Sequence, residues 1–147
     1  MGKSRSKLPK VGAAAPVGDD ERVRKSGDAD LQNGWLSRHG TLALTDDRLV
    51  FSPTVLDRAM LAKRREIVLD EVSEIERFPK HVDTGWAGRR ARVLVHTEPC
   101  IYELMVPDID AWIDAMEKVY ELRAKAGRRH KPTITREGYE NLLLAEE

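Results

Sequence analysis

The stretch from residue 40 to residue 53 contains two short segments in which hydrophobic and polar residues alternate. Leu42 and Leu44 share one face of the first segment, and after a pair of aspartates the apolar residues resume with Leu49 and Phe51. Alternation with a period of two is typical of a half-buried β-strand, and aspartate tolerates the backbone of a tight turn. The pattern therefore predicts a β-hairpin.

Other strand-like runs follow this hairpin. Their β-branched and alternating residues favour an extended backbone in the ranges 66–69, 92–97 and 101–106, and the last two form a second hairpin. Residues 70–75 carry early acidic residues and apolar residues three apart, which indicates one helical turn before the chain extends again at 76–78. We count six or seven short strands.

After residue 106 the hydrophobic period changes to that of an α-helix. Asp108 is placed as its N-cap, Gly127 is placed to end it, and its apolar stripe comprises Ile109, Trp112, Ile113, Met116, Val119 and Tyr120. Burying such side chains contributes roughly 1.5–3 kcal/mol each, so we interpret the stripe as the face that packs on the sheet. The expected core contains Leu42, Leu44, Leu49, Phe51, Val93, Val95, Trp112, Ile113 and Met116.

The first 27 residues differ in composition from the rest of the chain. Lysine and arginine are interspersed with Ser, Gly, Pro and Ala, and large apolar side chains are too few to offset the entropy of ordering the segment. We expect residues 1–27 to be a disordered basic arm, either a solvated tail or a weak tether to anionic lipid or nucleic acid. Order is expected to begin near Leu31, within a domain of residues 28–127, and Trp35 is expected in its core.

Residues 128–147 begin with basic residues that continue a cluster at the end of the predicted helix. Thr135 is placed to cap a last short helix, whose apolar side would comprise Tyr139, Leu142 and Leu143. We expect this tail to dock back on the domain or to bind another chain.

Composition narrows the classes of partner. The 147 residues include 25 Lys and Arg and 25 Asp and Glu, so an electrostatic partner must be recognised by a local patch. The single cysteine, Cys100, excludes an intramolecular disulfide and fits a reducing compartment, which favours the cytoplasm. No apolar run approaches the roughly 20 residues of a transmembrane helix, and a peripheral position at the membrane stays open.

Together these elements resemble a known family. The signature Gly-Thr-Leu-x-Leu-Thr-Asp-x-Arg-Leu-x-Phe at residues 40–51, the run at 67–75, and the order of two strands and a helix are similar to the GRAM domain, a member of the pleckstrin-homology-like (PH-like) superfamily. The resemblance spans roughly Leu31 to Arg123. It implies a mainly β fold, a partly open barrel of six or seven antiparallel strands closed by one C-terminal amphipathic helix. It also implies a module that binds phosphoinositides, other lipids or proteins.

The first candidate binding site is a group of four cations between the first hairpin and the next strand: Arg58, Lys63, Arg64 and Arg65. Several Lys and Arg donors in one connection are suited to a phosphate group. Asp57 and Glu66 flank the group and would partly neutralise it. The alternative is an ordinary solvated connection.

The second candidate site is an aromatic residue in a basic loop. Trp86 lies between Gly85 and Gly88, and Arg89 and Arg90 follow. An indole flanked by cations suits the interface between water and an anionic bilayer. Equally, Trp86 would serve to cover an open edge of the barrel.

Recognisable catalytic motifs are absent from the sequence. The four histidines are scattered, and His96 with Cys100 lacks the further ligands that a zinc site needs. There is no nucleophile elbow, P-loop or dinucleotide-binding fingerprint. We therefore expect no enzymatic activity, no metal and no cofactor.

Two functional hypotheses remain. The first is peripheral binding of anionic lipid or phosphoinositide headgroups through the two candidate sites. The second is a protein-interaction scaffold that uses the C-terminal segment or an open sheet edge. Nucleic acid has less support as a partner, because no aromatic residue lies among the N-terminal basic residues for base stacking.

Overall fold

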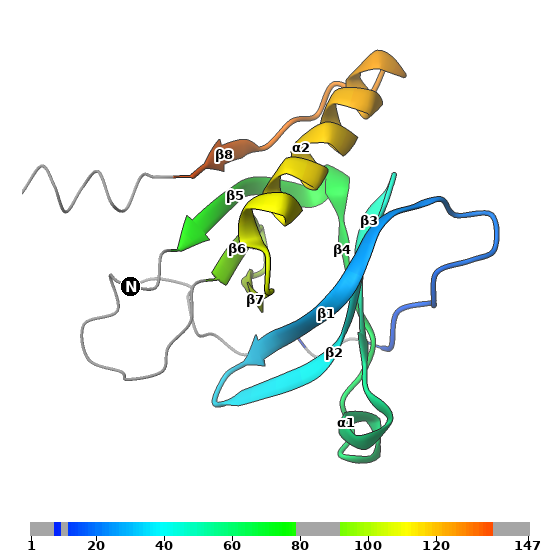
Figure 1. The fold of residues 1–147 in the computed structure, drawn as a ribbon, viewed down its shortest axis with the longest axis vertical. Helices are drawn as coiled ribbons and strands as arrows, with labels where there is room; N and C mark the ends of the chain where they lie inside the picture. Colours follow the sequence, from blue (N-terminus) through cyan, green and yellow to red (C-terminus); the bar gives the residue numbers. More distant parts are fainter. Residues whose placement is uncertain (1–7, 10–11, 79–91, 137–147) are drawn as a thin grey trace, which may run out of the picture.

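The computed structural model describes residues 8–9, 12–78 and 92–136, in which eight strands form one sheet and a long helix packs against it (Figure 1). The strands are β1 (Val23–Asn33), β2 (Leu36–Thr45), β3 (Arg48–Pro53), β4 (Arg65–Val68), β5 (Val72–Phe78), β6 (Arg92–Thr97), β7 (Ile101–Met105) and β8 (Thr133–Thr135). The helices are α1 (Val55–Ala59), the 3₁₀ turn η1 (Leu69–Glu71) and α2 (Ile109–Lys125).

The strands are arranged in the order β4-β3-β2-β1-β7-β6-β5-β8. The long strand β1 pairs with both β2 and β7 and so joins the two halves of the sheet, while β4 and β8 form its edges. The sheet, which is not closed, and its one main C-terminal helix confirm the predicted mainly β fold class. The strand count is corrected, because the described residues form eight strands and β8 runs parallel to β5.

The first hairpin forms as predicted, with Leu42 opposite Phe51 and Leu44 opposite Leu49. Its turn is fixed by Thr45, whose Oγ1 accepts the backbone N–H of Arg48 at 3.1 Å. All nine residues of the expected core are buried, as are many of their neighbours on the same faces. The strands predicted at 66–69, 92–97 and 101–106 are also confirmed within a residue of their bounds.

The predicted helix is α2, which lies across the sheet (Figure 1). Asp108 is its N-cap residue, although its side chain makes no capping hydrogen bond, and Gly127 follows its end with a φ of 93°. The Tyr120 hydroxyl donates to the Leu69 carbonyl at 2.7 Å and so ties the helix to η1. In the described ranges, no helix is both long enough and apolar enough to cross a membrane.

Two expectations for the N-terminal half are wrong. The first strand begins at Val23, eight residues before the expected start of order at Leu31. Trp35 is 94% exposed, because Gly34, with a φ of 63°, turns the β1–β2 hairpin and leaves the indole at its tip. The Asn-Gly pair was a sufficient signal for this turn, whereas the aromatic character of Trp35 suggested the core.

The C-terminal expectations are also corrected. Thr135 does not cap a helix but lies in β8, where residues 133–135 pair with Glu74, Ile75 and Glu76 of β5. Ile134 packs against the core and accounts for this docking. The helical turn predicted at 70–75 is shorter, since β5 already begins at Val72. Outside the described residues lie Tyr139, Leu142 and Leu143.

Candidate functional site

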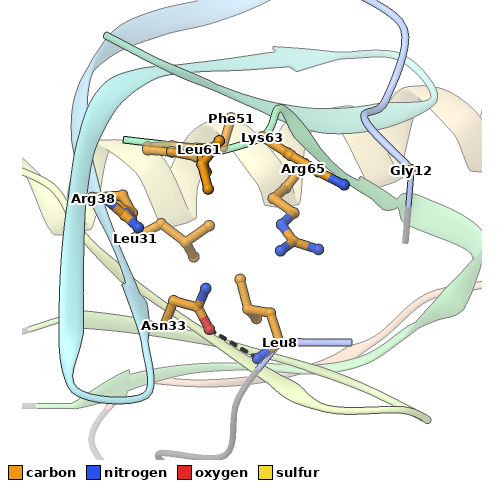
Figure 2. A pocket seen from close by; sticks show the side chains of 10 residues that line it. Leu8, Gly12, Leu31, Asn33, Arg38, Phe51, Leu61, Lys63 and Arg65 are labelled. Carbon is orange, nitrogen blue, oxygen red and sulfur yellow. Dashed lines mark hydrogen bonds between the residues drawn. The ribbon is translucent and has the colours of Figure 1, made fainter. Parts of the chain in front are cut away.

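A cavity of about 440 Å³ opens beside the β1–β2 hairpin and the β3–β4 connection (Figure 2). We call it the mouth. Buried apolar side chains, among them Leu31 of β1 and Phe51 of β3, form part of its wall. The full lining comprises Leu8, Gly12, Leu31, Asn33, Arg38, Phe51, Leu61, Ala62, Lys63 and Arg65.

Three cations reach the mouth from different elements, Arg38 from β2, Lys63 from the β3–β4 connection and Arg65 from β4. The Arg65 Nη1 donates to the Pro9 carbonyl at 2.7 Å, and the Arg38 Nη2 donates to the Met60 carbonyl at 3.4 Å. The Nε of Arg38 is buried and has no hydrogen-bond partner among the described residues. Neutral carbonyls do not compensate a full positive charge, so the mouth keeps a cationic lining.

The expected acidic neighbours do not neutralise these cations by ion pairing. Asp57 accepts the backbone N–H of His39, and Glu66 pairs with Arg48 at 2.9 Å. Five cations near the mouth lack an ion pair with any described residue: Arg38, Arg58, Lys63, Arg64 and Arg65. A chain with balanced total charge thus presents several cations without ion pairs around the mouth.

Leu8, Pro9 and Ala14, among the described N-terminal residues, contact this end of the sheet. The Leu8 side chain is only 5% exposed and belongs to the hydrophobic core, and its N–H donates to the Asn33 Oδ1 at 3.2 Å (Figure 2). Further along, the Ala14 N–H donates to the Arg64 carbonyl at 3.1 Å, and the Arg64 Nη1 donates to the Ala14 carbonyl at 3.3 Å. The described part of residues 1–27 is therefore in contact with the domain and borders the site.

The β3–β4 connection holds an unusual residue at the cavity. Helix α1 ends in a Schellman motif, in which the Leu61 N–H donates to the Arg58 carbonyl at 3.0 Å and the Ala62 N–H to the Asp57 carbonyl at 2.9 Å. This motif places Leu61 in the left-handed region, with a φ of 70°. Glycine is usual there, and for other residues this backbone conformation is less favourable by roughly 1–2 kcal/mol. Leu61 is also 86% exposed. A large apolar residue held at conformational cost in solvent suggests a role in contact with a partner.

Leu61 belongs to a larger group of exposed hydrophobic side chains. The group occupies the tip of the β1–β2 hairpin and helix α1 with the residues after it, both at the end of the sheet that carries the mouth (Figure 1). Hydrogen bonds from Thr54 N to the His39 carbonyl, 2.9 Å, and from Arg38 to Met60 hold α1 against β2. We call this group the apolar rim, and it comprises Trp35, Leu36, Val55, Leu56, Met60 and Leu61.

The structure brings part of the first candidate site together. Lys63 and Arg65 line the mouth, Arg64 lines an adjoining groove with Ala13, and Arg58 is exposed on α1 without lining the cavity. The second candidate site, Trp86 with Arg89 and Arg90, lies outside the described residues.

Sequence reasoning missed two parts of the site. Arg38 was not singled out, since one cation in an alternating strand is ordinary and only the strand register brings it to the β3–β4 connection. The apolar rim was missed because residues 54–62 were not recognised as a helix. Thr54, whose Oγ1 accepts the Asp57 N–H at 3.3 Å, was the available capping signal.

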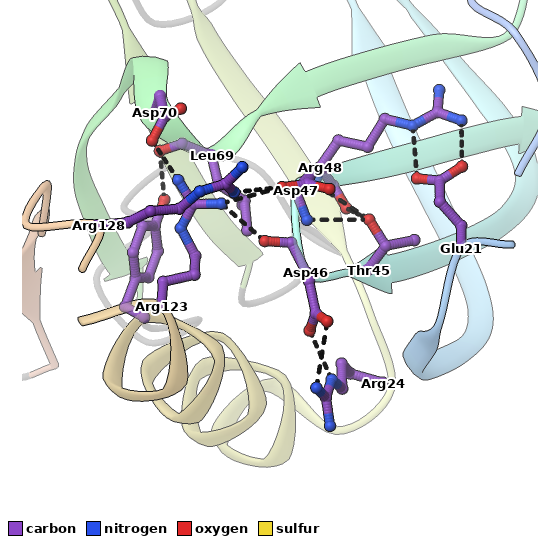
Figure 3. A network of polar contacts seen from close by, with 11 residues as sticks. Glu21, Arg24, Thr45, Asp46, Asp47, Arg48, Leu69, Asp70, Arg123 and Arg128 are labelled. Atoms are coloured by element: carbon purple, nitrogen blue, oxygen red, sulfur yellow. Dashed lines mark hydrogen bonds and ion pairs between the residues drawn. The ribbon is translucent and has the colours of Figure 1, made fainter. Parts of the chain in front are cut away.

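Cations at the opposite end of the β2–β3 hairpin have a different environment (Figure 3). The buried Arg123 of α2 donates to the Asp46 carbonyl at 2.7 Å and pairs with Asp70, while Arg128 pairs with Asp47. Arg24 pairs with Asp46 at 2.6 Å. Because these cations have anionic partners within the fold, the network fastens the end of α2 to two turns of the sheet and offers little charge to a ligand.

Glu21 and Arg48 form another paired group next to this network (Figure 3). Arg48 Nη2 donates to Glu21 Oε1 at 2.6 Å and Nε donates to Oε2 at 2.9 Å. These bonds, with a further one from the Gly18 N–H, lower the pKa of Glu21 from 4.5 to about 2. Arg48 also donates to the Ala15 carbonyl at 2.8 Å, so the pair helps to hold the N-terminal segment on the sheet.

We expect this pair to stabilise the protein above pH 4.5 and to lose its effect as the pH falls towards 2. The folded state holds the Glu21 proton more weakly than the unfolded chain, so acid favours unfolding. Urea titrations at about pH 5 and about pH 2.5 should show a smaller loss of unfolding free energy in Glu21→Gln than in the unmodified protein. Equal losses in both proteins would contradict the assignment.

No protein-family model and no curated protein sequence matches the chain. Solved structures do match. The hSac2 domain of the human phosphoinositide phosphatase Sac2 aligns with a TM-score of 0.54 at 12% identity, over 81% of this chain and 79% of that one. The C-terminal domain of an unknown protein from Leishmania infantum gives 0.53 at 19% identity, over 67% and 84%. The Spt16D–Pob3N heterodimer gives 0.50 at 8% identity, over 76% and 54%.

These similarities establish a shared fold. The shared fold is a mainly β sheet with one main C-terminal helix, while the resemblance to the GRAM domain and the PH-like superfamily stays a prediction.

Proposed function

We propose that this protein is a non-catalytic module that binds anionic lipid headgroups at the mouth and lies peripherally on the membrane. Arg38, Lys63 and Arg65 contact the headgroup phosphate, and the apolar rim enters the interfacial layer. Arginine and lysine both bind phosphate through charge-assisted hydrogen bonds. Transfer from water to the interfacial layer of a bilayer is favourable for Trp and Leu side chains.

The observation that carries the proposal is the coincidence of two unusual features at one end of the molecule. Cations without ion pairs line a cavity, and large hydrophobic side chains stand in solvent beside it. Soluble domains rarely expose such apolar groups without a partner. A bilayer with anionic headgroups satisfies both features together, because it offers negative charge at its surface and apolar material below.

The shared fold is compatible with this proposal. The hSac2 domain, which has the same architecture, comes from a phosphoinositide phosphatase. The argument nevertheless rests on this chain's own cations and hydrophobic residues. The alternative of a protein-interaction scaffold is not better supported: β4 and β8 are edge strands, but no feature of the described residues identifies a protein partner for them.

A vesicle flotation assay on the full chain tests the proposal, with neutral vesicles compared with vesicles that contain anionic lipid. Each cation near an anionic surface contributes about 1 kcal/mol, so Lys63→Gln with Arg65→Gln should weaken binding about 30-fold at low salt. Raising the salt from about 0.1 M to about 1 M shortens the screening length from about 10 Å to about 3 Å, so this difference should shrink. Trp35→Ala should instead lose a similar factor at both salt concentrations.

The matched control is Lys118→Gln with Lys125→Gln, which removes the same charge from exposed positions on α2. We expect this control to bind anionic vesicles within a factor of about three of the unmodified protein. The proposal fails if the unmodified protein does not float with anionic vesicles at low salt. It also fails if the control loses as much binding as the variant at Lys63 and Arg65.

A further inference from the structure

Two carboxylates and an imidazole meet on the outer face of the β5–β6 pair, and none of the three residues lines the mouth. Glu74 and Glu76 are two apart on β5, so their side chains leave the strand on the same side, opposite to the buried Ile75. His96 of β6 is the register partner of Glu74. The sheet backbone therefore fixes the relative positions of two carboxylates and one imidazole.

The donor atoms are already close together. The His96 Nε2 lies 2.9 Å from the Glu76 Oε1 and 4.0 Å from the Glu74 Oε1, and the three donors all lie within 4.8 Å of one another. Ligands at about 2.1 Å from a tetrahedral zinc ion are about 3.4 Å apart. Small side-chain rotations, without movement of the strands, would bring the donors to such distances.

The surroundings of the cluster favour a cation. Within the described part of the chain, no Lys or Arg lies within 4.0 Å of either carboxylate, and His96 is the only basic group so close. The second oxygen of Glu74 accepts the Thr135 hydroxyl at 2.8 Å, which orients the carboxylate as outer hydrogen bonds do in metal centres. All three side chains are partly exposed, at 21–34%, so an ion has access from solvent.

We infer that Glu74, Glu76 and His96 form a binding site for a divalent transition-metal ion. An imidazole with two carboxylates suits Zn²⁺ and its neighbours in the first transition series better than Mg²⁺ or Ca²⁺, which prefer oxygen donors alone. Three protein ligands leave a coordination position for water. A bound ion joins β5 directly to β6 and, through Glu74 and Thr135, steadies β8. The inference is independent of lipid binding at the mouth.

Isothermal titration of the full chain with ZnCl₂ at neutral pH tests the site. We expect one saturable Zn²⁺ per chain, a rise in Tm on saturation, and at least a tenfold loss of affinity in both His96→Asn and Glu76→Gln. The matched controls are His39→Asn and Glu121→Gln, which remove the same groups elsewhere and should bind Zn²⁺ within about twofold of the unmodified protein.

Circular dichroism without metal must show that each variant is folded before its affinity is compared. The inference is overturned if the unmodified protein shows no saturable binding below about 1 mM Zn²⁺. It is also overturned if folded His96→Asn binds as tightly as the unmodified protein, since the ion would then be held by other residues.

Discussion

Trp112→Ala should lower the free energy of unfolding by about 3–5 kcal/mol, the range measured when large aromatic side chains are removed from cores. Trp112 is a residue of α2, is 2% exposed and faces β1. Its Cζ2 would be 3.7 Å from a Cβ placed on Gly27 of that strand. The Lys25 Nζ lies 5.2 Å from the centre of the ring and adds a cation–π contact. Removing the indole leaves a cavity under the helix that the sheet is too rigid to fill. Urea titration of both proteins measures the difference.

The chain provides a control that has the same chemical change. Trp35 is at the tip of the β1–β2 hairpin in solvent, so Trp35→Ala should change the free energy of unfolding by less than about 0.5 kcal/mol. If both substitutions lower the free energy of unfolding by the same amount, Trp112 is not buried between α2 and the sheet as described. The comparison separates burial from any general effect of losing an indole.

Gly40→Ala should cost about 3 kcal/mol, at the upper end of the range for overpacked sites. A Cβ on Gly40 would lie 2.2 Å from the Ser52 carbonyl oxygen, 2.8 Å from the Phe51 Cζ and 2.9 Å from the Pro53 Cα. Two of these contacts are with backbone atoms, which cannot move aside without breaking the β2–β3 pairing. The expected result is a large loss of stability in thermal or urea unfolding, with weaker hydrogen-exchange protection along β2 and β3.

Gly27→Ala is the corresponding control within a strand. A Cβ on Gly27 meets only the Trp112 ring at 3.7 Å, an ordinary contact distance. This substitution should be neutral or slightly stabilising, because alanine restricts the unfolded chain more than glycine does. A Gly40→Ala variant as stable as Gly27→Ala would show that β2 and β3 are farther apart than described.

The comparison of Gly40 with Trp35 shows what could be predicted from the sequence. Hydrophobic alternation correctly predicted the strands around Gly40 and the buried faces of Leu42 and Phe51, because a period of two follows directly from the pleat. The core position expected for Trp35 rested on its aromatic character alone and is wrong. An indole is stabilised both in a protein core and at a membrane interface, so its presence in a sequence does not distinguish a buried position from an interfacial one.

The mouth was less predictable than the core for a related reason. The run Lys63-Arg64-Arg65 predicts a cationic segment, but consecutive side chains of an extended chain point alternately to opposite sides. Only the structure shows that Lys63 and Arg65 reach the cavity while Arg64 bonds to Ala14. Leu8 was also hidden from pattern analysis, because a lone hydrophobic residue in a polar stretch has no period.

The short strand β8 also has a consequence for the solubility of the protein. Its three residues cover Glu74 to Glu76 of β5, whose other side is paired with β6. An uncovered strand edge presents free N–H and C=O groups to other chains and is a common start of aggregation. With residues 133–135 in place, the three-residue β8 forms the edge of the sheet instead of the seven-residue β5. A chain cut before Thr133 would expose the backbone groups of Glu74 to Glu76 that β8 now pairs, and so present a longer edge to other chains.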